Sequence, residues 1–234
     1  MNQLPSLREM LDAGVHFGHK TSRWHPKMAP YIYISKSGVH VINLEETEAK
    51  LKEAVEFISR EASEGKTFIF VGTKKQSGEI VKEAAVEAGM PYVNVRWLGG
   101  TITNFEAIKS AVKNFQKQKE ELEKNNDLPK SELSKLRKEV ARGEKFLGGL
   151  VGMDRKPDAL ILFGSYDEKI ALREAKGINI PVVAVVDTNA DPNAVEYPIP
   201  ANDDATKSVK LIADTFARAI KEAKAKSAKV AETK

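Results

Sequence analysis

Cations and an aromatic ring alternate near the start of the chain, in the stretch HKTSRWHPK at residues 19–27. Lys20, Arg23 and Lys27 can neutralise phosphates, which releases counterions from a nucleic acid. Trp24 and His25 carry flat rings that can stack on an unpaired base. The pattern predicts contact with RNA. The competing interpretation is that the tryptophan anchors a core and its neighbours are merely solvated.

A second pair of a cation and an indole, Arg96-Trp97, stands just before two glycines at 99 and 100. Thr103 and Asn104 follow directly and bring further polar groups to the same place. We predict that four residues here contact RNA: Arg96, Trp97, Thr103 and Asn104. For Trp97, which follows an apolar strand, packing in the core competes with this role.

Other site chemistries have less support in the sequence. The chain has no cysteine, which excludes disulfides, thiolate metal sites and cysteine nucleophiles. His16 and His19 are spaced three apart, but no carboxylate lies between them, so packing or RNA contact fits them better than a metal. Four aspartates follow predicted strands and could suggest a Mg²⁺ cluster: Asp187, Asp191, Asp203 and Asp204. Turn formation and helix capping explain them more simply.

A nucleotide site is the main alternative to RNA binding. Gly72–Ser77 places a glycine and two lysines, Lys74 and Lys75, after a strand, but without the spacing of a phosphate-binding loop. No G-x-G-x-x-G follows a strand, and no serine or carboxylate pair is placed for catalysis. We expect that the protein is not an enzyme and that it uses no cofactor, metal or small-molecule substrate. We expect the Lys74 and Lys75 side chains to be exposed or anion-facing. A small nucleotide-binding α/β enzyme or regulator using Gly72–Ser77 and Asp187 is the alternative hypothesis.

The composition fits a soluble protein with a polyanionic partner. Hydrophobic residues make up 41% of the 234 residues and the net charge is +4. The basic excess lies at the ends, since residues 1–40 and 221–234 each hold five Lys/Arg against two acids. No apolar run approaches the roughly 20 residues that span a bilayer, and the start lacks a signal-peptide pattern. We expect a cytoplasmic protein without a membrane partner.

The elements that must position these side chains alternate between strand and helix. Apolar runs predict strands at 67–72, 92–95, 158–163, 182–186 and 197–199, and periodic segments predict helices at 4–13, 45–63, 76–88, 167–176 and 204–222. This alternation predicts an α/β fold, a Rossmann-like parallel sheet with helices on both faces. Residues 31–35 and 39–44 form a predicted β-hairpin. Residues 13–30 have no regular period and are predicted to be an extended loop.

A charged segment with helical periodicity interrupts the alternation at 103–147. Apolar residues repeat at three and four on both sides of a predicted turn at 125–129, which predicts an antiparallel coiled-coil hairpin. Thr103 and Glu106 are spaced as a capping box at its start. The predicted organisation is therefore a sheet domain at 1–102 and 148–222, an inserted hairpin, and a basic disordered tail at 223–234.

Short motifs spread along the chain resemble the bacterial type of small-subunit ribosomal protein two. They are AGVHFGH at 13–19, RWHPKM at 23–28, FVGTK at 70–74, RWLGG at 96–100 with Thr103-Asn104, PDA at 157–159, VDTNADP at 186–192 with IP at 199–200, and NDD at 202–204. They occur in order over about residues 5–215, so the match does not depend on one motif.

The resemblance implies a flavodoxin-like sheet with a protruding helical hairpin, of the bacterial or organellar branch. It also implies a structural, non-catalytic role in the small ribosomal subunit during translation. Its expected partners are 16S-type ribosomal RNA near the junction of head and body, and other small-subunit proteins. These include protein one, which captures messenger RNA.

Overall fold

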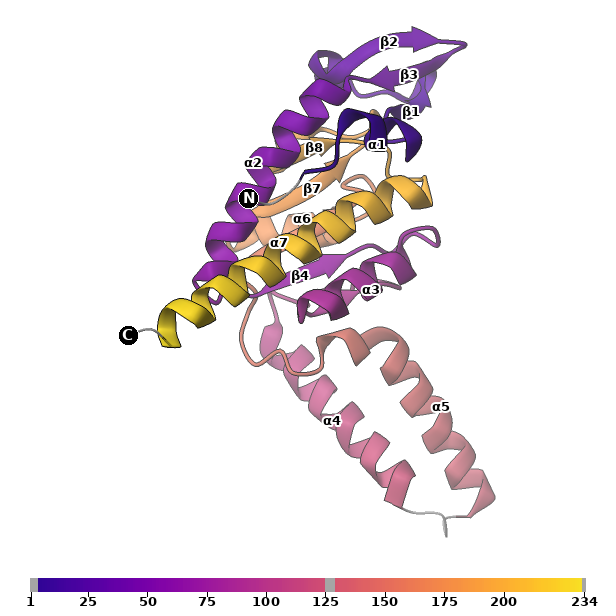
Figure 1. Cartoon of the computed structure of the whole chain (residues 1–234). Helices are drawn as coiled ribbons and strands as arrows, with labels where there is room; N and C mark the ends of the chain where they lie inside the picture. Colours follow the sequence, from indigo (N-terminus) through magenta and orange to yellow (C-terminus); the bar gives the residue numbers. More distant parts are fainter. Residues whose placement is uncertain (1–3, 125–128, 233–234) are drawn as a thin grey trace.

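A five-stranded parallel sheet forms the centre of the computed structural model, which describes residues 4–124 and 129–232 (Figure 1). Its strands are β4 (Phe68–Val71), β5 (Tyr92–Val93), β6 (Ala159–Phe163), β7 (Val182–Val186) and β8 (Tyr197–Pro200). They lie in the order β5-β4-β6-β7-β8, and every neighbouring pair is parallel. This is the strand order of flavodoxin-like folds. The α/β prediction is confirmed.

Helices bury both faces of the sheet, which is why β4, β6 and β7 are continuously apolar. On one face lie α2 (Leu44–Ser63), α3 (Gly78–Ala88) and α7 (Thr206–Glu232), around a core that includes Phe70, Phe163 and Phe216. On the other face, α6 (Lys169–Gly177) and the start of α4 cover a second core with Trp97 and Met28. None of the helices within the described ranges could cross a membrane.

The N-terminal residues form a small antiparallel sheet that the sequence predicted only in part. After α1 (Leu7–Asp12), the strands β1 (Phe17–Lys20), β2 (Ile32–Lys36) and β3 (Val39–Ile42) pair in the order β1-β3-β2. The β2–β3 hairpin is confirmed. The prediction of an irregular loop at 13–30 is wrong, because this segment holds β1 and two 3₁₀ turns, Thr21–Arg23 and Pro26–Tyr31. In β1 exposed and half-buried residues do not alternate, so no strand period could reveal it.

Two helices, α4 (Phe105–Lys124) and α5 (Lys130–Leu147), leave the sheet together between β5 and β6 (Figure 1). The nine apolar positions of the predicted seam are all buried or half-buried: Phe105, Ile108, Val112, Phe115, Leu122, Leu133, Leu136, Val140 and Leu147. Phe115 packs so closely on Gly143 that a Cβ there would collide with its ring. Coiled-coil packing of this pair remains a prediction. The turn predicted at 125–129 lies largely outside the described residues.

The ends of the inserted segment and of the chain differ from the predicted boundaries. Phe105 and Val112 belong to the second core, so the packed part of the sheet domain extends beyond residue 103 into α4. A 3₁₀ turn, Gly148–Leu150, leads from α5 back toward β6. Helix α7 continues to Glu232, past the predicted end at 222. Lys224 Nζ donates to the Ala88 carbonyl at 2.9 Å, which fastens this extension to the end of α3.

Candidate nucleic-acid interface

The loop with alternating cations and rings lies on the surface beside the antiparallel sheet. Lys20, Arg23 and Trp24 are exposed, and the Trp24 side chain keeps 40% of its surface accessible. Its ring lies 5.3 Å from that of His40, centroid to centroid. Within residues 4–124 and 129–232, neither the Lys20 nor the Arg23 side chain has a hydrogen bond or an ion pair. Two free cationic side chains and an accessible indole therefore belong to the same exposed loop.

The turn after β7 holds this loop in place through its backbone. The amide of His25 donates to the Thr188 carbonyl at 2.7 Å, and the amide of His19 donates to the Thr188 hydroxyl at 2.8 Å. Gly18 approaches Thr188 so closely that a Cβ would collide with the threonine side chain. These contacts fix the loop through backbone amides and the Thr188 side chain, without using the side chains of Lys20, Arg23 or Trp24.

Lys27 and His25 contribute to this anchoring more than their exposure suggests. Lys27 Nζ pairs with Asp191 at 2.7 Å, and this hydrogen bond lowers the pKa of Asp191 below its ordinary value. The half-buried His25 ring accepts from the Lys27 amide at 3.3 Å. Lys27 is thus partly neutralised by the chain itself. Lys20 and Arg23 carry the uncompensated charge.

Glu174 on α6 organises the second predicted cluster around Trp97. The indole Nε1 of Trp97 and the amide of Gly100 donate to Glu174 Oε1 at 3.0 and 2.7 Å. The amides of Ile102 and Thr103 donate to Oε2, each at 3.2 Å. Burial would raise the pKa of Glu174, but these hydrogen bonds outweigh it and lower the pKa. One carboxylate therefore fixes the segment that leads into α4.

This arrangement corrects two predictions. Trp97 is only 4% exposed, so its ring packs in the core and is closed to base stacking. The Thr103 hydroxyl donates to Glu174 at 3.0 Å, and the described residues show no capping-box hydrogen bond between Thr103 and Glu106; the Asn104 carbonyl accepts from the amides of Ala107 and Ile108. Thr103 and Asn104 are exposed at the root of the hairpin, and so is Arg96. Their contact with RNA remains a prediction.

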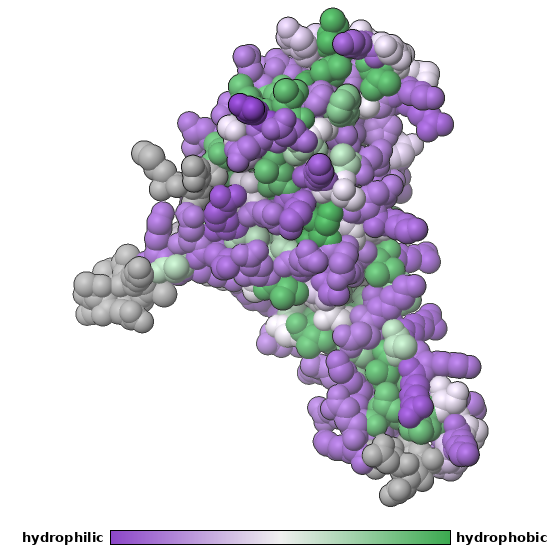
Figure 2. Space-filling model, turned by 45° about the vertical axis from the view of Figure 1, so that its right-hand side comes forward, coloured by the Kyte–Doolittle hydropathy of each residue, from purple (hydrophilic) through white to green (hydrophobic). Residues whose placement is uncertain are grey.

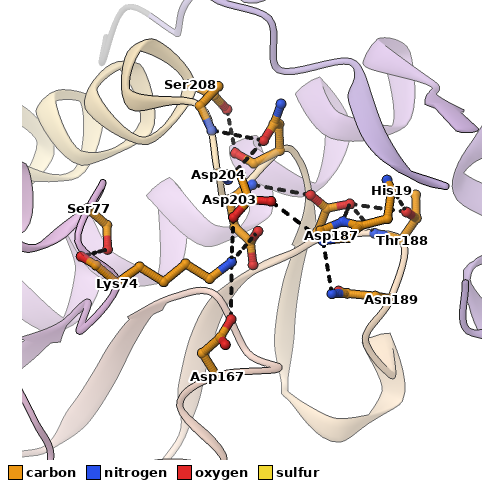
Figure 3. Close-up of polar contacts among 12 residues, drawn as sticks. His19, Lys74, Ser77, Asp167, Asp187, Thr188, Asn189, Asp203, Asp204 and Ser208 are labelled. Carbon is orange, nitrogen blue, oxygen red and sulfur yellow. Dashed lines mark hydrogen bonds and ion pairs between the residues drawn. The ribbon is translucent and has the colours of Figure 1, made fainter. Parts of the chain in front are cut away.

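The carboxyl ends of β4 and β6 form the switch point where ligands bind in such sheets, and here the chain fills it. Lys74 lies 2.7 Å from Asp203, 2.9 Å from Asp204 and 3.1 Å from Asp167 (Figure 3). Burial alone would lower the pKa of Lys74, but the charge of Asp203 and these hydrogen bonds raise it. Of the two lysines predicted to be exposed or anion-facing, Lys75 is exposed, whereas Lys74 is half-buried and faces three carboxylates of its own chain.

Asp203 and His19 complete the polar network in Figure 3. Asp203 is fully buried, and burial together with the neighbouring Asp187 charge raises its pKa to about 7, against the opposing charge of Lys74. His19 Nδ1 lies 3.0 Å from Asp187, which raises the pKa of His19 despite its burial. Asn202 Oδ1 accepts from the amides of Asp204 and Ala205, in the turn just before α7 begins at Thr206.

These contacts weigh against the alternative sites considered from the sequence. The described residues contain no group of three or more His, Asp or Glu placed to hold a metal ion. Lys74, the candidate phosphate ligand of Gly72–Ser77, is held by three carboxylates. A nucleotide phosphate at this edge would face Asp203 and Asp204 and be repelled.

Comparison with known families agrees with the fold. A family model described as ribosomal protein S2 matches residues 10–223. The chain belongs to the ribosomal protein S2 family. The members of this family are structural ribosomal proteins and not enzymes. The chain is therefore a structural protein of the small ribosomal subunit, which is a ribonucleoprotein particle that acts in translation.

Three contributors to the ribosomal protein S2 architecture were not identified as such from the sequence: Glu174, Thr188 and Lys74. Glu174 stands in an ordinary amphipathic helix and accepts from residues more than 70 positions away. In the sequence, Thr188 stands only within the motif at 186–192, and Lys74 is only a candidate phosphate ligand. No local pattern distinguishes a surface glutamate or lysine from one that a distant loop will enclose.

Proposed function

We propose that the chain binds small-subunit ribosomal RNA through the loop at residues 19–27. The observation that carries this proposal is the pair of cations with unpartnered side chains, Lys20 and Arg23, in the same exposed loop as the accessible Trp24 ring. Cations attract phosphates and an indole face accepts an unpaired base, so the three side chains match both parts of an exposed nucleotide. Membership of a ribosomal family supports RNA as the polyanion.

Arg96 and the exposed polar residues at the root of the hairpin extend this surface in the proposal. Arg96 has no hydrogen bond or ion pair in the described part of the chain, so its charge is available for a phosphate. The position near the head-body junction and the role in holding small-subunit protein one are inferred from the resemblance described above. They belong to the same proposal.

Charge reversal at Arg23 tests the RNA contact without disturbing the anchor. Arg23→Glu should lower the affinity for a small-subunit ribosomal RNA transcript by about tenfold or more at moderate salt, and should reduce the salt slope by about one or more. Lys52→Glu is the matched control, since Lys52 is exposed on α2, away from the loop. Lys27→Glu is less clean because it would also break the ion pair with Asp191.

Binding is measured by fluorescence anisotropy at several salt concentrations. Equal affinities and equal salt slopes for Arg23→Glu and Lys52→Glu would show that the loop does not contact RNA. The retention of protein one is tested separately, by sedimenting small subunits that contain or lack this chain. If protein one remains bound equally to both, that part of the proposal is wrong.

A further inference from the structure

A groove of about 540 Å³ lies along one side of the hairpin, where α4, α5 and the segment after β5 meet. Its floor is apolar and comes from all three segments, with Leu98, Phe115 and Phe146 among the lining residues. Figure 2 shows hydrophobic side chains gathered on the hairpin between hydrophilic ones. The volume falls within the range of small-ligand pockets.

The polar side chains around this floor are mostly without partners. Arg96, Asn114 and Arg142 line the groove and are exposed, and none of their side chains has a hydrogen bond or ion pair in the described residues. Glu139 is the one carboxylate in the lining, and its Oε2 already accepts from Gln118 at 2.9 Å. Two cations and a free amide thus face an apolar floor with little competing negative charge.

This combination matches an unpaired nucleotide better than a protein segment. A base needs an apolar or aromatic surface for its face and an amide for its polar edge, and its phosphates need cations. The free Asn114 amide offers both a donor and an acceptor, and the arginines can grip phosphate in a bidentate manner. Arg96 also belongs to the proposed RNA surface, so the groove continues that surface onto the hairpin.

We propose that this groove binds a single unpaired nucleotide of ribosomal RNA. The base lies over Leu98 and Phe146 with its edge at Asn114, and Arg96 and Arg142 hold the flanking phosphates. This inference rests on the proposed function, because it assigns a second contact to the same RNA. It concerns a different place, since the base would lie in the groove of the hairpin and not on the exposed Trp24 ring.

Arg142→Ala and Arg137→Ala form a matched pair that tests the groove. Both remove one exposed arginine from α5, but only Arg142 lines the groove. With the full chain and a small-subunit ribosomal RNA transcript, Arg142→Ala should weaken binding about fivefold to tenfold, whereas Arg137→Ala should change it less than about twofold. Asn114→Ala should also weaken binding, with a salt slope equal to that of the natural chain.

Photocrosslinking identifies the occupant. A transcript that carries 4-thiouridine should crosslink to peptides containing Phe146 or Leu98, at a nucleotide that is unpaired in the free RNA. Equal effects of Arg142→Ala and Arg137→Ala, or no crosslink at the groove, would overturn this inference. Crosslinks from a photoreactive residue at position 114 to another protein in assembled subunits would also overturn it. The loop variant Arg23→Glu separates the two proposals, because it tests the RNA contact independently of the groove.

Discussion

Replacement of Glu174 by glutamine should destabilise the protein although the side chain keeps its size. The carboxylate accepts from Trp97 Nε1, from the amides of Gly100, Ile102 and Thr103, and from the Thr103 hydroxyl. Glutamine keeps only one acceptor oxygen, so its amide group must face either the first two donors or the last three. The retained hydrogen bonds also lose their charge assistance.

The expected loss follows from these five donors. Hydrogen bonds to a charged group contribute roughly 1.5–3 kcal/mol and neutral ones roughly 0.5–1.5 kcal/mol. Losing two charge-assisted bonds alone would cost about 3–6 kcal/mol, and weakening the other three would add to this loss. Because Glu174 is only half-buried, solvent reduces this to about 2–3 kcal/mol of unfolding free energy.

The loss should depend on pH in a defined direction. The pKa of Glu174 is lowered in the folded protein, because the hydrogen bonds that it accepts outweigh the effect of burial. Its contribution is therefore complete above the unfolded value of about 4.3 and disappears as the pH falls through the folded pKa. The natural chain and Glu174→Gln should thus differ most near pH 7 and converge in acid.

Urea unfolding of the full chain at pH 7 and at a series of pH values below the unfolded pKa of about 4.3 measures this difference. Glu83→Gln is the control, since Glu83 is exposed on α3 without a partner in the described residues and its loss should cost less than about 0.5 kcal/mol. If Glu174→Gln were as stable as Glu83→Gln at pH 7, the carboxylate would not be what holds the root of the hairpin.

Two further predictions concern the charged network and the hairpin. Lys74→Met should cost about 3–5 kcal/mol at pH 8, because it leaves Asp203 buried and unpaired. The pKa of Asp203 is raised to about 7, so its protonation below that pH removes the buried charge. The loss of unfolding free energy caused by Lys74→Met should therefore be smaller at pH 5 than at pH 8. Equal losses at both pH values in urea unfolding would contradict this. Replacement of residues 117–141 by a short glycine linker should leave cooperative thermal unfolding intact. Removal of 105–146 should cost at least about 3–5 kcal/mol, because it takes Phe105 and Val112 out of the core, and equal melting temperatures for the two deletions would refute this.

The sequence predicted the parts of the fold that depend on local apolar patterns. The runs that became β4, β6 and β7 are continuously apolar because both faces of each strand are covered, and this signal survives without knowledge of the neighbours. The apolar seam of the hairpin could also be predicted from a local pattern, because its apolar residues repeat at intervals of three and four. The exposure of Lys20 and Arg23 also agrees with the prediction made from their cation-rich context.

Features that depend on distant partners could not be predicted in this way. Trp97 had two possible roles in the sequence, and only Glu174, which lies 77 positions away, decides for the core. Lys74 lies 129 positions from Asp203, so its burial follows from strand order and not from its own neighbours. Strand β1 pairs with β3 across an irregular register, which leaves no period to detect.

The hairpin also affects how the sheet can assemble. It separates β5 from β6, and β6 must pair with β4 on the side away from β5. A long flexible connection would add loop-closure entropy, about 0.6 kcal/mol for each doubling of its length. Because α4 and α5 run out and back and bond to each other through Gln118 and Glu139, the two ends of the insertion meet again at its root. The folded hairpin therefore acts as a short connection between β5 and β6 when β6 pairs with β4. The protein can carry a long protruding arm with little reduction of its folding rate.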